Sequence, residues 1–253
     1  KLFVAGIIPG IILSLLYIMY TVGAVVVNPS LAPAVPEEEE EPLTSGEIVS
    51  TVGVVLLIAI VLGGIWGGAF TATEAAGIGA LCAMVLAIIK GLRWKGIVEA
   101  VIDAGKTSAP IMILLVTAGM YSRFLALADI QTIIKDSLLS LGIGAFGIAV
   151  MMIVLWLLLG MILDSISIIL LTVPIFATFA PLLGMDGFAF AIFGILLIEA
   201  GLLTPPFGLV VYVVKGAVPD SGVSLAEIFR GSIPYWILML ITAGLIWVFP
   251  GIA

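Results

Sequence analysis

The sequence has 253 residues, of which 63% are hydrophobic and only 10% are charged. Soluble domains usually carry about one quarter charged residues, so this composition excludes an ordinary water-soluble domain. The chain has no histidine and one cysteine, Cys82, which argues against hydrolytic or redox enzymes and excludes an intramolecular disulfide. The net charge of -7 comes mostly from the glutamate run at residues 37–41, and nothing indicates nucleic-acid binding.

Apolar stretches long enough to cross a lipid bilayer recur from one end of the chain to the other. The first is expected at residues 2–27, and two more at 48–66 and 75–89 are expected to pair antiparallel. Prolines surround the glutamate run, so residues 29–46 are predicted to form a polar cytoplasmic loop. The chain begins at Lys1 without a methionine, and we expect it to be a fragment of a longer protein.

A fourth span is expected at residues 110–125, after a separate short amphipathic stretch that ends at Lys106. Residues 129–141 carry isoleucine and leucine at helical spacing with polar residues opposite, which predicts a helix lying in the membrane interface. The last span is expected at residues 233–249.

Two apolar pieces, 146–159 and 165–179, flank the segment from Gly160 to Asp164. Each is short for a full crossing, so a re-entrant helical hairpin competes with one long, broken crossing. Basic residues mark the cytoplasmic side of a membrane. If the basic residues at 90–106 are cytoplasmic, a hairpin puts Lys215 and Arg230 on that side, whereas a full crossing puts them outside. We therefore predict a hairpin with both ends on the outer side.

A second break interrupts the apolar stretch 188–214 between Glu199 and Gly208. Its adjacent prolines lack amide hydrogens and disfavour helix before them, which predicts an unwound transmembrane helix. Unwound backbone persists in the bilayer core only where protein or a filled cavity satisfies it. Oxygens freed at the two breaks suit sodium, and helix N-termini near Ser165 and Pro206 favour an anion. The alternative is that both breaks are kinks filled by neighbouring helices.

A short pattern occurs near both ends of the chain, at residues 6–13 and again at 231–238, with the same Gly, Ile, Pro, Ile and Leu positions. In the topology above, the first and last spans cross in opposite directions, as inverted repeats do. The pattern predicts one whole repeat preceded by the final helix of another. A chance match is the alternative, because glycine and proline are common near the ends of spans.

Three ordered motifs resemble the large membrane subunit of tripartite ATP-independent periplasmic (TRAP) transporters. They are Gly68-Ala69-Phe70-Thr71-Ala72-Thr73-Glu74-Ala75-Ala76, Leu163-Asp164 leading to Thr172-Val173-Pro174-Ile175-Phe176, and Gly201-Leu202-Leu203-Thr204-Pro205-Pro206-Phe207-Gly208. The resemblance covers the whole chain and corresponds to roughly the C-terminal half of that subunit. It implies an all-α integral membrane protein with an inverted-repeat, elevator-type ion-transporter fold, a re-entrant hairpin and an unwound transmembrane helix.

The resemblance also implies a function and a division of the chain. The expected function is sodium-coupled import of a small organic acid across the bacterial inner membrane, with a small membrane subunit, a periplasmic binding protein and membrane lipid as partners. The expected transport domain is 142–217, which holds the hairpin and the broken helix. The expected static scaffold comprises 1–28 (the last helix of the preceding repeat), 47–141 with the interfacial arm, and the terminal helix in 218–253.

The resemblance further implies which residues bind the ion and the substrate. The expected sodium ligands lie at Gly160, Gly201, Thr204 and the backbone of Phe207. The expected substrate-binding residues are Asp164, Ser165, Ser167 and Pro205. The related divalent-anion/sodium symporters carry Ser-Asn-Thr at a hairpin tip, where this chain has Asp164, Ser165 and Ile166, so it departs from their pattern there.

Two other polar features have local interpretations. Thr71 and Glu74 fit a capping box, which predicts a helix start rather than a ligand site. Glu199 is either an ion-carrying carboxylate within the membrane or a cap for the half-helix after the break.

For the whole chain, the alternatives to a TRAP subunit are a stand-alone divalent-anion/sodium symporter, a non-transporting membrane scaffold and a channel subunit.

Overall fold

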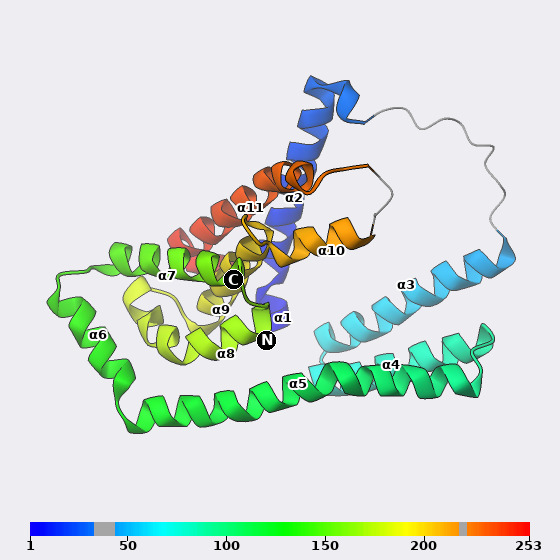
Figure 1. The fold of residues 1–253 in the computed structure, drawn as a ribbon, viewed down its shortest axis with the longest axis horizontal. Helices are drawn as coiled ribbons and strands as arrows, with labels where there is room; N and C mark the ends of the chain where they lie inside the picture. Colours follow the sequence, from blue (N-terminus) through cyan, green and yellow to red (C-terminus); the bar gives the residue numbers. More distant parts are fainter. Residues whose placement is uncertain (33–43, 218–221) are drawn as a thin grey trace. The chain divides into compact units, whose positions relative to one another are not determined.

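The computed structural model describes residues 1–32, 44–217 and 222–253, and all regular secondary structure in these residues is helical (Figure 1). The first half contains α1 (Leu2–Ala5), α2 (Ile7–Val27), η1 (Pro29–Leu31), α3 (Ser45–Trp66), α4 (Ala72–Ile89) and α5 (Trp94–Leu127). The second half contains α6 (Ile130–Ser140), α7 (Ala145–Gly160), α8 (Ser165–Phe176), η2 (Ala177–Leu183), α9 (Gly187–Leu203), α10 (Leu209–Ala217), α11 (Leu225–Val248) and η4 (Pro250–Ile252).

Six helical segments of the described chain are long and apolar enough to cross a membrane. They are Leu2–Val27, Gly46–Trp66, Ala72–Ile89, Trp94–Leu127, Ser165–Leu183 and Leu225–Val248. The predicted all-α, multi-pass membrane architecture is thereby confirmed. The predicted loop at 29–46 is described only at its ends, and the glutamate run at 37–41 lies outside the described residues.

The described helices belong to two compact units, one formed by residues 1–31 with 112–253 and the other by residues 32–111. The expected division of the chain into a scaffold, which includes 1–28 and 218–253, and a transport domain at 142–217 concerns which parts move, and it stays a prediction. In the structure the terminal helices pack with the hairpin unit, since α11 lies along α9 and α2 packs against α11. Both terminal helices therefore belong to the same unit as the hairpin.

The core of the unit formed by 1–31 and 112–253 surrounds α9, which packs against α7, α8 and α11. Trp156 of α7 is fully buried at its centre. Its ring lies 5.2 Å from that of Phe176 and 6.2 Å from that of Phe193, measured between centroids, in edge-to-face geometry. Aromatic pairs in this arrangement contribute about 0.5–1.5 kcal/mol beyond the area that they bury. The hairpin is thus fixed to α9 by large, tightly packed side chains.

In the other unit, α3 and α4 form the antiparallel pair that the sequence predicts. Glycines on each helix receive side chains of the other, since a Cβ on Gly53 would meet Leu86 at 2.9 Å and one on Gly79 would meet Val61 at 3.0 Å. The turn ends in the predicted capping box: the Glu74 amide donates to the Thr71 hydroxyl at 3.3 Å, and the Thr71 amide donates to the Glu74 carboxylate at 2.8 Å.

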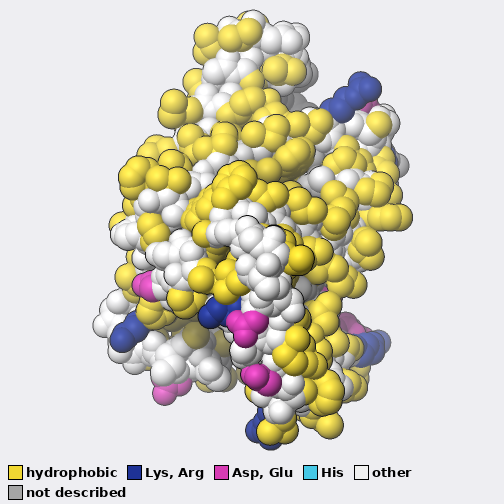
Figure 2. Space-filling model, turned by 90° about the vertical axis from the view of Figure 1, so that its left-hand side faces the viewer, with side chains coloured by type: hydrophobic (Ala, Val, Ile, Leu, Met, Phe, Trp, Pro, Cys, Tyr) yellow, Lys and Arg dark blue, Asp and Glu magenta, His cyan; other side chains and the backbone are white. Residues whose placement is uncertain are grey.

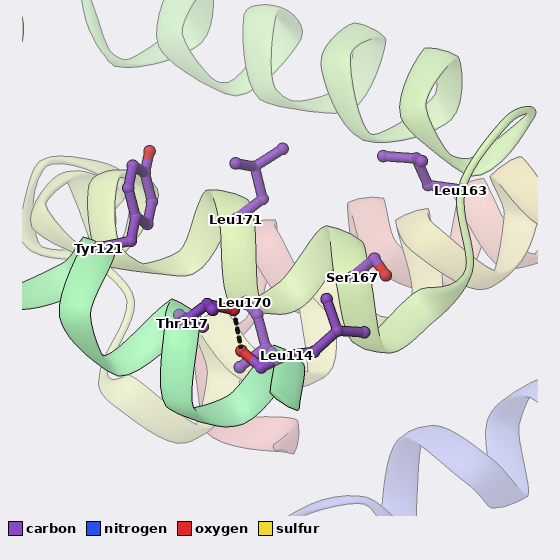
Figure 3. Close-up of a pocket in the computed structure, with 8 residues that line it drawn as sticks. Leu114, Thr117, Tyr121, Leu163, Ser167, Leu170 and Leu171 are labelled. Carbon is purple, nitrogen blue, oxygen red and sulfur yellow. Dashed lines mark hydrogen bonds between the residues drawn. The ribbon is translucent and has the colours of Figure 1, made fainter. Parts of the chain in front are cut away.

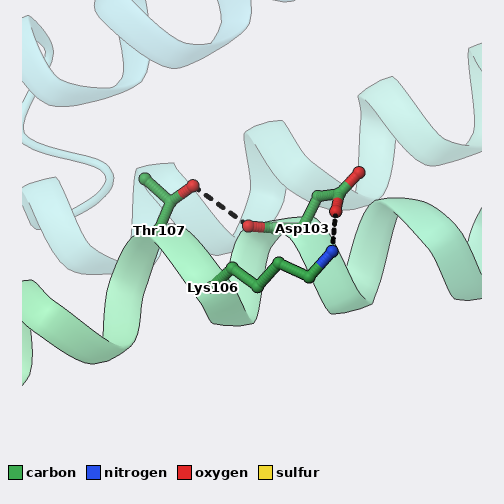
Figure 4. A network of polar contacts seen from close by, with 3 residues as sticks. All are labelled: Asp103, Lys106 and Thr107. Atoms are coloured by element: carbon green, nitrogen blue, oxygen red, sulfur yellow. Dashed lines mark hydrogen bonds and ion pairs between the residues drawn. The ribbon is translucent and has the colours of Figure 1, made fainter.

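The sequence predicts a separate amphipathic stretch followed by a span from 110 to 125, and this prediction is wrong. Helix α5 is a single helix of 34 residues that continues through Pro110. At 1.5 Å per residue it is about 50 Å long, well beyond the ~30 Å hydrocarbon core. Its charged first part forms ion pairs within the helix, including Lys106 to Asp103 at 2.9 Å, beside Thr107, whose hydroxyl donates to the Asp103 carbonyl at 3.0 Å (Figure 4).

Helix α6 matches the amphipathic helix predicted at 129–141. Ile134 and Leu138 pack against the core around α9, and the Gln131 amide donates to the Pro174 carbonyl of α8 at 2.6 Å. Its placement in the membrane interface stays a prediction.

Hydrophobic side chains cover much of the surface visible in Figure 2, with charged side chains scattered singly or in small groups. Such a surface is typical of contact with lipid rather than water.

Candidate functional site

The first break is a helical hairpin formed by α7 and α8. Helix α7 ends at Gly160, and α8 begins at Ser165. The buried indole of Trp156 donates to the Thr172 hydroxyl at 2.8 Å, and that hydroxyl donates to the Ile168 carbonyl at 2.7 Å. Trp156 and Thr172 are equally far in sequence from Asp164, so the two arms run antiparallel from this tip. The position of the hairpin's ends relative to the membrane stays a prediction.

Asp164 caps the N-terminus of α8. One carboxylate oxygen accepts from the Ser167 amide at 3.0 Å, and the other accepts from the Ser167 hydroxyl at 2.6 Å. The sequence predicts that the positive end of this half-helix faces a substrate anion. In the structure the protein's own carboxylate already occupies that end, so Asp164 and Ser167 first satisfy each other.

The second break is narrower than the sequence predicts. Helix α9 continues through Glu199 as far as Leu203, and α10 begins at Leu209, so the unwound segment is only 204–208 and the half-helix does not begin near Pro206. The Pro205–Pro206 bond is cis. Gly208 closes the segment with a φ of 31°, where a Cβ would approach the Phe229 ring at 2.7 Å. A glycine is therefore needed at this position.

The prolines decide which carbonyls at the end of α9 lack helical partners. Pro205 and Pro206 cannot donate to the carbonyls of Gly201 and Leu202, four residues earlier. The Thr204 amide donates instead to Gly201 at 3.0 Å, and the Thr204 hydroxyl donates to Ala200 at 2.7 Å. Within the described chain, the Leu202 carbonyl accepts no hydrogen bond. Leu202 is not among the site residues predicted from the sequence, although Pro206, four residues later, indicates that its carbonyl lacks a helical partner.

The two breaks meet at a pair of glycines. A Cβ on Gly160 would lie 2.7 Å from the Gly201 Cα, and one on Gly201 would lie 2.8 Å from the Gly160 Cα. Only hydrogen atoms fit between these backbones, so α7 and α9 touch directly where the hairpin turn begins and the unwound segment follows. Among the expected sodium ligands, the structure thus brings Gly160 and Gly201 into contact and places Thr204 three residues further on.

The remaining expected site residues are distributed as follows. Ser165 is half-buried, and its hydroxyl donates to the Glu199 carboxylate of α9 at 2.7 Å. The alternative prediction for Glu199 is that it caps the half-helix after the break. That interpretation is wrong, because Glu199 lies within α9 and its side chain contacts the hairpin tip. Pro205 and Phe207 are exposed on the unwound segment.

A cavity of about 310 Å³ lies beside the hairpin tip, between α8 and the second half of α5 (Figure 3). Ser167 and Leu163 line one side of it, and Thr117 and Tyr121 line the other. None of its eight described lining residues is charged, and leucine is the commonest among them. The cavity therefore suits an apolar group better than a carboxylate.

Among the described residues near the two breaks, the ligands suited to a hard cation are oxygen atoms. No cluster of three or more His, Cys, Asp or Glu side chains occurs among the residues that the structure describes. A cation there would be held by backbone carbonyls and hydroxyls, which are the groups that broken transmembrane helices supply to sodium. The Leu202 carbonyl and the second lone pairs of Gly201 and Thr204 are suitable donors.

Apolar helices long enough to span a bilayer define a multi-pass membrane protein, and a hairpin in contact with a broken helix is an arrangement that secondary transporters use. Residues 1–252 match the family "Tripartite ATP-independent periplasmic transporter, DctM component", and the chain belongs to this family. The resemblance noted in the sequence is thereby confirmed.

Curated relatives agree with this family. The chain is 29% identical to the C4-dicarboxylate TRAP transporter large permease protein DctM of Pseudomonas aeruginosa, over 95% of this chain and 56% of the relative. It is 28% identical to the sialic acid TRAP transporter large permease protein SiaM of Vibrio cholerae (98% and 57%) and to the ectoine TRAP transporter large permease protein TeaC of Halomonas elongata (100% and 58%). The chain thus spans little more than half the length of these relatives, which are permeases rather than enzymes.

Proposed function

We propose that this chain is part of the membrane subunit of a sodium-coupled secondary transporter that imports a small organic acid. A periplasmic binding protein delivers the acid, and a small membrane subunit accompanies the large one in the bacterial inner membrane. Family membership supports transport, and the names of the relatives indicate organic solutes of several kinds. In this proposal the hairpin and the broken helix move together in an elevator-type cycle.

The observation that carries the proposal is the contact between Gly160 and Gly201. Two interruptions of helical hydrogen bonding are costly in a membrane, because no water is present to satisfy the freed groups. Their direct contact gives them one shared set of oxygen atoms. Sodium then binds between the breaks, with the Thr204 hydroxyl and carbonyls near Gly160, Gly201 and Phe207 as ligands. The Leu202 carbonyl joins this set.

Thr204→Ala tests the sodium site. The variant removes one hydroxyl but keeps both prolines, so the break should persist while sodium binding weakens. Loss of one interaction of ~1–3 kcal/mol lowers the affinity by roughly one to two orders of magnitude. The measurement is sodium-dependent thermal stabilisation of the full-length protein in nanodiscs, with potassium at matched ionic strength as reference. Thr107→Ala is the control, since Thr107 makes the same bond to a carbonyl four residues earlier in α5. Unchanged sodium dependence in a folded Thr204→Ala protein would refute the site.

Reconstitution tests the coupling and the partners. The complete large subunit, its small subunit and the binding protein are placed in liposomes, and uptake of succinate, sialic acid and ectoine is measured with and without an inward sodium gradient. We expect uptake only with all three proteins and the gradient. Uptake by the large subunit alone would favour the stand-alone symporter, and gradient-independent flux would favour a channel.

A further inference from the structure

Glu199 is an ionisable residue within a helix that is otherwise apolar. It lies in α9, two residues before Gly201, and is half-buried. Both ion pairs formed within the described residues lie in α5, so Glu199 has no basic partner there. Its bond is with the Ser165 hydroxyl, the first residue of α8, at 2.7 Å. An ionisable group inside a membrane segment is costly and usually serves function.

The direction of this hydrogen bond limits what Ser165 can bind. A serine hydroxyl has one hydrogen to donate and two lone pairs that accept, whereas an ionised carboxylate only accepts. While Ser165 donates its hydrogen to Glu199, the hydroxyl presents only lone pairs to any other partner. Lone pairs ligate a cation, but they cannot donate to the carboxylate of an organic acid.

We propose that Glu199 is a positioning residue for the transported sodium ion, and that Ser165 is a ligand of this ion rather than of the acid. The inference deepens the proposed function and rests on its sodium site. It revises the role expected for Ser165 from the sequence, which was substrate binding. It also gives Glu199 a definite role, which is to fix the rotation of the Ser165 hydroxyl and to supply negative charge beside the cation.

The placement of the bond supports this role. Gly160 and Gly201 hold α7 and α9 in backbone contact, and the Ser165–Glu199 bond links the start of α8 to the same part of α9. The bond therefore joins a residue directly after the hairpin turn to one in the last turn and a half of α9 before the unwound segment, close in sequence to the proposed sodium ligands. A half-buried carboxylate interacts more strongly with a nearby cation than an exposed one does, because protein surroundings screen charge less than water does.

The experiment uses the full-length protein in nanodiscs with sodium chloride as the probe and potassium chloride as the reference, read as thermal stabilisation. Glu199→Gln keeps an acceptor for Ser165 but removes the charge, and we expect the sodium concentration for half-maximal stabilisation to rise about tenfold. Ser165→Ala should produce a comparable rise, and Ser165→Thr, which keeps the hydroxyl, should restore most of the response. Glu99→Gln is the matched control, since Glu99 is paired with Lys95 in α5, and it should leave sodium binding unchanged.

The outcomes separate this inference from the proposed function. If Glu199→Gln and Ser165→Ala bind sodium like the parent while Thr204→Ala does not, Glu199 only holds the hairpin against α9, and the inference is overturned. If Thr204→Ala also binds like the parent, the proposed sodium site itself fails. Should Glu199→Gln not fold, the comparison of Ser165→Ala with Ser165→Thr decides: equal sodium dependence in these two variants overturns the inference.

Discussion

The helices around α9 and the pair α3–α4 are all apolar, yet they differ in what they bury. Around α9, the side chains of Trp156, Phe179 and Phe193 are completely inaccessible to solvent. In the described part of residues 32–111, only Ala75 is buried. Lipid tails are as apolar as leucine, so hydrophobicity alone does not drive one membrane helix against another. Close packing in a membrane therefore has to come from shape and from polar bonds.

Both sources of packing occur where the hairpin meets α9. The Gly160–Gly201 contact supplies close approach, and the Ser165–Glu199 bond links the hairpin to α9, while the Trp156–Thr172 bond joins the two arms of the hairpin itself. Helices α3 and α4 have glycine contacts with each other but expose their outer faces, which suits contact with lipid or another subunit. The comparison predicts that substitutions around α9 have large effects and that similar ones in α3–α4 have small effects.

The largest effect is expected from Gly160→Ala. The new methyl group would lie 2.7 Å from the Gly201 Cα, where only backbone movement makes room. We expect a loss of about 2–3 kcal/mol in the free energy of unfolding, measured by SDS titration, together with loss of sodium-driven uptake. Gly244→Ala in α11 is the control, because a Cβ at that position would meet no neighbouring side chain or helix within 4 Å, and it should be neutral or slightly stabilising. Equal stability of the two variants would contradict the backbone contact.

A smaller effect is expected from replacing tryptophans in the two units. Trp156→Phe removes a buried indole that donates to Thr172 and leaves space unfilled, so unfolding should become easier by about 2 kcal/mol. Trp66→Phe at the end of α3, where the side chain is exposed, should change stability by less than about 0.5 kcal/mol. The same SDS titration measures both. Similar losses for both tryptophans would contradict the contrast between the units.

The smallest effect is expected from the helix caps, and it should be the same in both units. Thr71 caps α4 and Ser224 caps α11, each through a reciprocal bond with a glutamate three residues later. Capping is local and does not depend on how a helix packs, so Thr71→Ala and Ser224→Ala should each cost about 1 kcal/mol. Thr73→Ala, within the first turn of α4, is the control. A much larger loss at Ser224 than at Thr71 would show that the cap of α11 also supports tertiary packing.

The sequence by itself determined the membrane class, the positions of most helices, the two breaks and the family. These features follow from local chemistry: apolar runs of sufficient length, prolines without amide hydrogens, and a threonine three residues before a glutamate. Local chemistry was insufficient at Pro110, since a proline within a long helix can be accommodated, and at residues 199–203, which stay helical up to the last residue before Thr204.

Tertiary structure alone decided which helices pack together and which atoms meet. The sequence contains Gly160, Gly201, Ser165 and Glu199, but it does not show that the two glycines touch or that the serine donates to the glutamate. It also does not show that α2 and α11 pack with the helices around α9. The physical reason is the solvent: lipid-facing and protein-facing sides of a membrane helix are both apolar, so the sequence pattern that identifies the buried side of a soluble helix is missing here.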